Sequence, residues 1–357
     1  MKTKNWGRTT RFNLVTYAIV IIGYLAMEIM NGFGILSNSL RGQLVPICTY
    51  IILAISLNLT VGVLGELSLG HAGFMSVGAF AGAFFSVCTE QLIPAAWLRF
   101  PIALLIGGIT AGALGVLIGI PVLRLQGDYL AIVTLAFGEI IKNLFNSFYV
   151  GIDAAGAHFS LTDAGSLGMQ PDGKIIINGA MGITGTPKDA TFTIGFVLIL
   201  ITLFIVLNLM KSRAGRAIMS IRDNRIAAES VGINITKYKM LAFSLSAALA
   251  GVAGVLYAHN FSTLVAKKFD YNTSILILVF VVVGGMGNMR GSIIAAAALT
   301  VLPEMLRGLN DYRMLIYAII LIGMMIFNQN PRMIEWRKKI SAKMPKFALK
   351  SAKKEGK

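Results

Sequence analysis

Residues 44–64 read LVPICTYIILAISLNLTVGVL, an uncharged run long enough to cross a membrane as one helix. A bilayer core about 30 Å thick requires about 20 consecutive apolar residues in a helix. Glu66 is the single charge between this run and a second uncharged run at 67–89. The sequence therefore predicts two membrane spans joined by a short segment that is rich in glycine.

The composition of the whole chain indicates the same class of protein. Charged residues make up 13% of the 357 positions, against about 25% in soluble domains, and hydrophobic residues make up 56%. A soluble monomer of this composition would expose too much apolar surface. The two cysteines and three histidines are too few and too scattered for a disulfide framework or a metal site, and the chain contains no P-loop sequence. We expect an integral membrane protein without a metal or cofactor of its own.

Ten apolar segments are predicted to span the membrane, which gives an all-α polytopic protein with broken helices. These segments are 12–30, 44–64, 67–88, 100–123, 129–149, 192–210, 240–258, 274–289, 292–307 and 314–327. The first segment follows a basic N-terminus, as a secretory signal does, but it lacks a small-x-small cleavage site and many further spans follow it. A retained first helix is therefore predicted.

The net charge of +16 is concentrated in three segments. Residues 1–11 carry +4, residues 211–239 carry +5, and residues 331–357 carry +8. Basic loops stay on the cytoplasmic side of a membrane, and six and four predicted spans separate these clusters, so all three are predicted to be cytoplasmic. The same count places 150–190 outside the cell and makes 12–330 the transmembrane domain. The clusters at 1–11 and 331–357 are interpreted as topology signals that also attract anionic lipid, without a nucleic-acid partner.

The basic segment 211–239 carries a pattern besides its charge. It is predicted to form two short helices with an apolar stripe, and such helices lie on the bilayer surface or in a groove of a partner protein. Gly232 is predicted to end the second helix in a left-handed conformation. The small residues Ala227-Ala228-x-x-x-Gly232 resemble the EAA loop of ABC-importer permeases, although Ile226 stands where that pattern has Glu. The stripe consists of Ile218, Ile221, Ile226 and Val231.

The EAA resemblance implies that a short coupling helix of this loop docks on an ATPase subunit. The residues expected to form this coupling loop are Arg216, Arg222, Asn224, Ala227, Ala228 and Gly232.

Charged and polar residues within or beside the predicted spans are the candidates for a transport pathway. Glu66 either caps the helix that follows it or lies in a backbone break that lines a cavity. His71 is either a packing residue or part of that lining. Asp128 is a predicted N-cap. Glu139 and Lys142 lie on one helix face, where they form either an internal ion pair or part of a route for a zwitterionic substrate. The candidate pathway residues are Glu66, Ser68, His71, Tyr129, Thr134 and Glu139.

Two further glycine patterns are expected to be structural. Gly284-Gly285-x-Gly287 is predicted to break the chain between the eighth and ninth spans. Its likeness to the glycine series from Gly62 to Gly73 suggests an internal repeat of the kind seen in transporters. Small-xxx-small faces for helix packing are predicted at Gly107, Gly108, Gly112, Gly115 and Gly119.

Several motifs in a fixed order resemble the LivM-type permeases of branched-chain amino-acid ABC importers. They are GELSLGHAGF at 65–74, GDYLAIVTLAFGEII at 127–141, GITG at 182–185, SRAGRA at 212–217, RDNRIAA at 222–228 and VGGMGNMRG at 283–291. The resemblance covers roughly residues 45–330. It implies ATP-driven import of leucine, isoleucine and valine, or of related small amino acids, across a prokaryotic cell membrane. It also implies a second homologous permease, two cytosolic ATPase subunits and an extracytoplasmic amino-acid-binding protein, so that ATP is hydrolysed on other chains.

Two other classes of protein stay open at this stage. The charges at Glu66, Asp128, Glu139 and Lys142 are compatible with a secondary transporter that uses an ion or proton gradient instead of an ATPase. An intramembrane enzyme would need a clustered nucleophile or metal set, and the sequence shows neither.

Overall fold

The computed structural model describes residues 8–329, apart from 35, 126, 154–155 and 171–172. Most of the predicted basic N-terminus and the whole of the predicted tail at 331–357 lie outside these residues. The chain divides into two units, Met1–Glu304 and Met305–Lys357. Each unit is described by itself.

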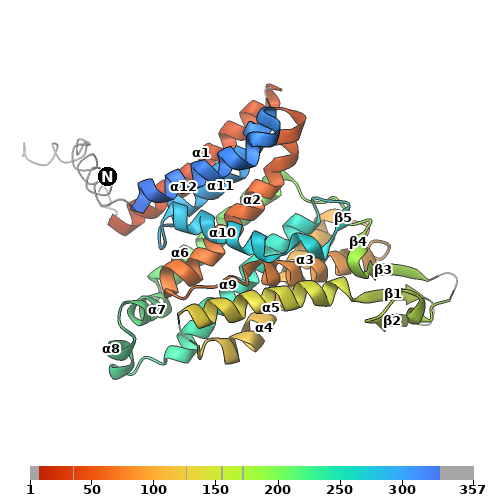
Figure 1. The fold of residues 1–357 in the computed structure, drawn as a ribbon, viewed down its shortest axis with the longest axis horizontal. Coiled ribbons are helices and arrows are strands. Elements are labelled where there is room, and N and C mark those ends of the chain that lie inside the picture. The colour runs from red at the N-terminus through yellow and green to blue at the C-terminus, as the bar shows by residue number, and fades with distance from the viewer. Residues whose placement is uncertain (1–7, 35, 126, 154–155, 171–172, 330–357) are drawn as a thin grey trace, which may run out of the picture. The chain divides into compact units, whose positions relative to one another are not determined.

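The first unit is a bundle of helices (Figure 1). Its helices are α1 (Arg8–Gly32), α2 (Asn38–Asn58), α3 (His71–Cys88), α4 (Ala96–Val122), α5 (Asp128–Asn146), α6 (Phe192–Lys211), α7 (Arg213–Asp223), α8 (Arg225–Ser230), α9 (Ile235–Ala258), α10 (Tyr271–Gly284) and α11 (Met289–Met305). Its short helical turns are η1 (Leu59–Leu64), η2 (Gly165–Leu167), η3 (Gly179–Met181) and η4 (Ala266–Lys268). The second unit contains η5 (Leu306–Tyr312) and α12 (Arg313–Gln329).

Every one of the ten predicted spans coincides with a helix, which confirms a helical membrane protein. Among the described residues, seven helices are long and apolar enough to cross a membrane. They begin at Leu14, Asn38, His71, Ala96, Phe192, Ile235 and Met289. The helices α5, α10 and α12 fall outside this group: α5 is long enough but carries several charged and polar residues, and α10 and α12 have only 14 and 17 residues. The predicted count of ten is thus not confirmed.

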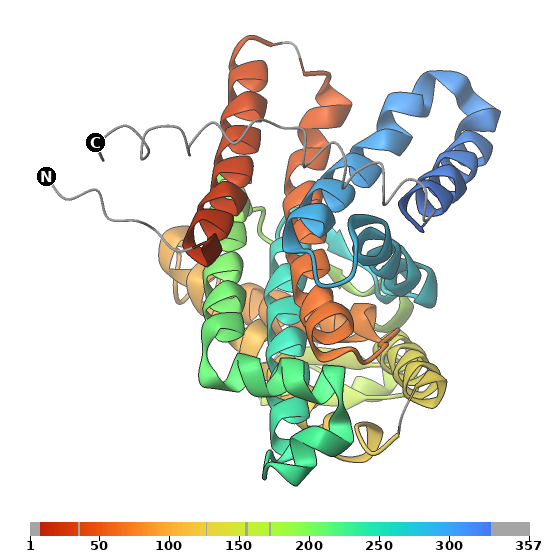
Figure 2. The same ribbon diagram turned by 90° about the vertical axis from the view of Figure 1, so that its left-hand side faces the viewer.

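Helix α9 runs through the middle of the bundle (Figure 2), where it packs against α2, α3 and α4. Small residues allow these helices to approach closely. A Cβ atom added to Gly78 would lie 2.3 Å from the Cα of Gly251, and one added to Gly251 would lie 2.4 Å from the carbonyl oxygen of Gly107. A Cβ atom on Gly115 would lie 2.7 Å from the Cβ of Ala247. The small-residue packing face predicted for α4 is therefore confirmed, with α9 as its partner.

One end of the bundle carries a five-stranded antiparallel sheet, in the order β2-β1-β3-β4-β5. The strands are β1 (Tyr149–Asp153), β2 (Gly156–Ser160), β3 (Lys174–Asn178), β4 (Ile183–Thr184) and β5 (Thr263–Leu264). The first four come from the predicted extracytoplasmic loop, whereas β5 follows α9, and Ile183 pairs with Leu264. The sequence did not indicate this small sheet, which adds short strands to an otherwise helical membrane protein. The sheet lies at the opposite end of the bundle from α7 and α8 (Figure 1).

Candidate functional site

The chain is broken between η1 and α3, at residues 65–70. The end of α2 widens into the π-helical turn η1, and Gly65 then adopts a left-handed conformation with φ +83°. A π-helical turn within a helix often marks a functional site, and positive φ favours glycine. The break confirms the predicted unwinding of the backbone. The alternative that Glu66 caps α3 is wrong, because α3 begins only at His71, after Gly70, and the Glu66 carboxylate accepts a hydrogen bond from Lys239 Nζ.

A second break separates α10 from α11, as predicted. Gly285 and Gly287 both have positive φ values, 93° and 79°. The amide of Gly287 donates to Asn58 Oδ1 at 2.8 Å, and Asn58 Nδ2 donates to Ser292 Oγ at 2.8 Å. A Cβ atom on Gly62 would lie 2.2 Å from the amide nitrogen of Gly287. The two glycine-rich breaks therefore contact each other directly, with the fully buried Asn58 between them.

Besides Glu66, three candidate pathway residues gather at the first break. The Thr134 hydroxyl accepts from the amide of Leu69 at 3.0 Å, which attaches the break to α5. His71 Nε2 lies 2.7 Å from Ser56 Oγ, as expected for a packing residue. The hydroxyl of Ser68 is buried and has no hydrogen-bond partner among the described residues. A buried hydroxyl without a partner is unusual and marks a place where a ligand or water can bind.

The other candidates on α5 lie apart from this group. Tyr129 is 74% exposed. Glu139 pairs with Lys142, as predicted, and also accepts from the amide of Tyr271 at 3.0 Å, so it joins α5 to α10. Asp128 is the first residue of α5 instead of its N-cap, because Gly127 takes the cap position. The N-cap prediction for Asp128 is thus wrong by one residue.

The predicted coupling loop forms the two helices α7 and α8. Ser212 and Asn224 cap them by accepting from the amides of Gly215 and Ala227. The second helix ends as predicted: Gly232 has φ +84°, and its amide donates to the backbone carbonyl oxygen of Glu229. Figure 2 shows α7 turning away from the axis of α6 at this end of the bundle.

The predicted apolar stripe of the loop divides into two parts. Ile218 and Ile221 on α7 are buried, whereas Ile226 and Val231 are 77% and 76% exposed. Ala228 is also buried. The first part holds the loop on the bundle, and the exposed pair forms an apolar surface on and just beyond α8. Arg216 stays within the loop, where its guanidinium donates to the carbonyl of Lys211.

Arg222 connects the loop to the first break. Its Nη1 donates to the carbonyl oxygen of Gly62 at 3.0 Å, and its Nε and Nη2 donate to Asp223. A Cβ atom on Gly65 would lie 2.6 Å from Arg222 Cγ, so the aliphatic part of the arginine occupies the space beside that glycine. Arg222 therefore links α7 directly to the backbone of the break.

Comparison with known protein families gives a match over most of the chain. Residues 39–327 match the family described as the permease component of branched-chain amino acid transport systems. The chain belongs to this family. No solved structure matches the chain significantly.

Individual relatives of this permease include two proteins named as the high-affinity branched-chain amino acid transport system permease protein LivM. The protein from Escherichia coli is 36% identical over 293 residues, and that from Salmonella typhimurium is 35% identical over 287 residues. Each alignment covers 78% of this chain but 66% of the relative, just under two thirds. The nucleoside ABC transporter permease protein NupC of Lactococcus lactis subsp. cremoris is 24% identical over 215 residues, which cover 56% of this chain and 60% of NupC.

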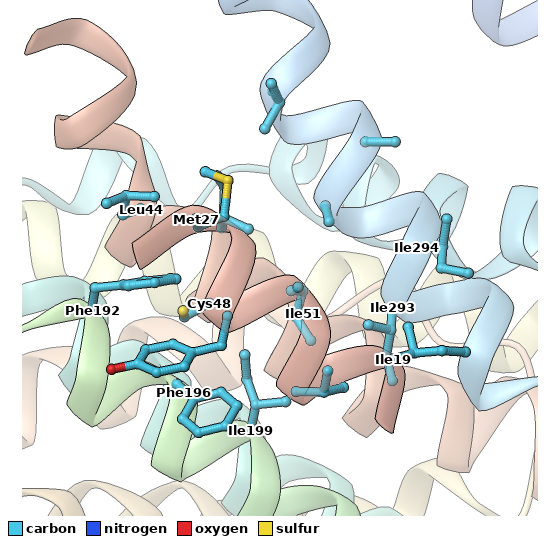
Figure 3. Close-up of a pocket in the computed structure, with 17 residues that line it drawn as sticks. Ile19, Met27, Leu44, Cys48, Ile51, Phe192, Phe196, Ile199, Ile293 and Ile294 are labelled. Carbon is cyan, nitrogen blue, oxygen red and sulfur yellow. The ribbon is translucent and has the colours of Figure 1, made fainter. Parts of the chain in front are cut away.

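The permease also has an apolar cavity of about 340 Å³, bounded by α1, α2, α6 and α11. Figure 3 shows side chains such as Ile51, Phe196 and Ile293 pointing into it. Among the described residues, no charged side chain lines this cavity.

The sequence did not indicate two members of the site. Asn58 joins the breaks, and Lys239 pairs with Glu66. An amide side chain within the apolar run 44–64 was a usable signal for Asn58, because buried amides require hydrogen-bond partners. Lys239 gave no such signal, since it belongs to the basic segment 211–239.

Proposed function

We propose that this chain is the membrane-embedded permease subunit of an ATP-driven importer. The observation that carries the proposal is the hydrogen bond from Arg222 to the Gly62 carbonyl, because it joins a loop suited to docking a partner with a break in a membrane span. Two sites become coupled when a structural element contacts both of them and has more than one arrangement. The chain itself hydrolyses no ATP and carries no cofactor in this proposal.

Branched-chain amino acids are the proposed substrates. The membership of the family and the two LivM relatives support this choice. NupC is named as a nucleoside transporter, so the same architecture serves other solutes, and a comparison of leucine with a nucleoside is the direct test of substrate class. The pathway is proposed to pass the first break, at Ser68, His71 and Thr134.

The proposed assembly contains a second homologous permease, two cytosolic ATPases and an extracytoplasmic binding protein. Ten spans with both termini in the cytoplasm are proposed, which places α7 and α8 inside the cell and the sheet outside. Contacts at both ends of the bundle support this topology. Arg222 on α7 contacts the break after η1, so these two segments lie on one side. Strand β4 pairs with β5, so the loops that contain them lie together on the other side. A gradient-driven transporter is disfavoured, since Glu66 and Glu139 already have lysine partners.

The exposed pair Ile226 and Val231 provides a sharp test. We expect the double variant Ile226→Glu/Val231→Glu to abolish co-purification of the ATPases, because charges would replace the apolar docking surface. Arg213→Glu, an exposed change in the same loop, is the matched control. Unchanged co-purification in the double variant would contradict the docking assignment.

Uptake of leucine, and not of adenosine, by the complete complex in vesicles would establish the substrate class.

A further inference from the structure

A buried ion pair fixes the first break against α9. Lys239 Nζ donates to Glu66 Oε1, and the two side chains are only 4% and 14% exposed. Lys239 lies near the start of α9, whereas Glu66 lies directly after the left-handed Gly65. Because a buried charge without its partner is very unfavourable, the pair opposes any movement that would separate these two segments.

Arg222 is placed to disturb this pair. It contacts the two glycines that lead into Glu66, by packing on Gly65 and by donating to the carbonyl of Gly62. Helix α7 contacts both η1 and α9, so a displacement of the loop acts on the two segments that the ion pair joins.

A polar cavity of about 220 Å³ lies beside the pair. Its lining includes Glu66 and Lys239 as well as Arg222 and Arg225 of the coupling loop. Within the described part of the chain, Arg225 has no ion-pair partner. The cavity thus offers the Glu66 carboxylate both room to move and a second set of cations, and it is large and polar enough for water.

We propose that the Glu66–Lys239 ion pair locks the first break, and that transport requires Glu66 to leave Lys239 for the arginines of the coupling loop. This inference rests on the proposed function and adds to it a positioning role for Glu66, which then holds the backbone instead of binding substrate. The proposed change of partner would give the lock two discrete arrangements, as coupling between distant sites requires.

Hydrogen exchange on the purified chain tests the lock without any partner protein. The amide of Leu69, bonded to Thr134, reports on the break. In Glu66→Gln we expect this amide to exchange at least tenfold faster, because the break opens more often. The matched control is Asp189→Asn, which removes a partner of the buried Arg99–Asp189 pair at the other end of the bundle. Unchanged exchange of Leu69 in Glu66→Gln would overturn the lock.

The complete complex in vesicles tests whether transport uses the lock. We expect Glu66→Gln to raise the number of ATP molecules hydrolysed per leucine taken up at least fivefold, whereas Asp189→Asn leaves this ratio unchanged. The exchanged pair Glu66→Lys/Lys239→Glu should bring the Leu69 exchange rate back to within about threefold of the wild type. Faster exchange with an unchanged ATP-to-leucine ratio would overturn the role in transport.

Arg225 tests the second arrangement. Since Arg225 takes no part in the locked pair, Arg225→Gln should leave the exchange rate of Leu69 unchanged but lower ATP-driven uptake at least threefold. Normal uptake in Arg225→Gln would overturn the proposed change of partner. Failure of the ATPases to co-purify with the wild type would reject the proposed function, and the exchange experiment would still decide whether the lock exists.

Discussion

The two ends of the bundle are held together by different kinds of bond. At the coupling end, which comprises the two breaks and α7, side chains bond to backbone groups that no helix satisfies, as Arg222 does with Gly62 and Asn58 with Gly287. At the sheet end, backbone ladders join β1 to β5, and Arg99 pairs with Asp189 at 3.0 Å. Contacts made by single side chains can be exchanged one at a time, whereas a ladder opens only as a unit. The difference suggests that the coupling end moves and the sheet end stays fixed.

The largest effect is expected from Gly62→Ala at the coupling end. The new Cβ would lie 1.9 Å from Asn58 Oδ1 and 2.2 Å from the Gly287 amide nitrogen, so the breaks could not meet. We expect a loss of more than about 4 kcal/mol and little folded protein. Size-exclusion chromatography of a fluorescent fusion measures the folded yield. Gly23→Ala in α1, where no atom lies within 4 Å of the new Cβ, should behave as the wild type.

At the sheet end, Asp189→Asn is expected to cost about 3 kcal/mol, because it leaves the buried Arg99 guanidinium without its counter-charge. Thermal unfolding in detergent measures the loss. A melting temperature equal to that of the wild type would show that this pair contributes little to the stability of the sheet end.

Asn58→Leu tests the contact between the two breaks at the coupling end. It removes both hydrogen bonds between the breaks and leaves the Gly287 amide without a partner, which should cost about 2 kcal/mol. Ser292→Ala removes only one of these bonds and should cost about half as much. Thermal unfolding of the two variants, compared with the wild type, measures both losses; equal stability of Asn58→Leu and the wild type would argue against the junction of the breaks.

The smallest effect concerns pH at the sheet end. Burial lowers the pKa of His259, whose Nε2 lies 2.8 Å from Ser86 Oγ. Below pH 6.5 the unfolded chain therefore binds a proton that the folded chain does not, and stability should fall as the pH drops from 6.5 towards the lowered pKa. We expect a small loss of stability over the first pH unit below 6.5. Melting temperatures of the wild type and His259→Gln between pH 7 and 5 measure it, since the variant should lack this slope.

Much of the fold follows from local sequence signals. Apolar runs indicated every span, and glycines indicated both breaks and the end of α8, because membrane helices and positive φ angles depend on neighbouring residues. Features that depend on distant residues were missed. Lys239 lies 173 positions from Glu66. Strand β5 has two residues and pairs with β4, although helices α6 to α9 lie between the two strands in the sequence. A strand so short has no periodicity to detect.

Of the candidate site, the glycine series from Gly62 to Gly73 indicated that Ser68 and His71 lie in or beside one break, whereas the contact of Thr134 with that break was not predicted. Their partners could not be foreseen, since the pairing of helices α3 and α5 is decided by packing. In the coupling loop, Ile218 is buried and Ile226 is exposed. This division of the apolar stripe likewise depends on how α7 packs against the bundle.

The pairing of β4 with β5 has a mechanical consequence. Helices α6 and α9 leave the sheet end next to these strands, so their ends are tied together there, while their other ends flank α7 and α8. A tied end acts as a fulcrum. We therefore expect the helices to swing as levers, with displacements that are largest near Arg222 and vanish near Ile183.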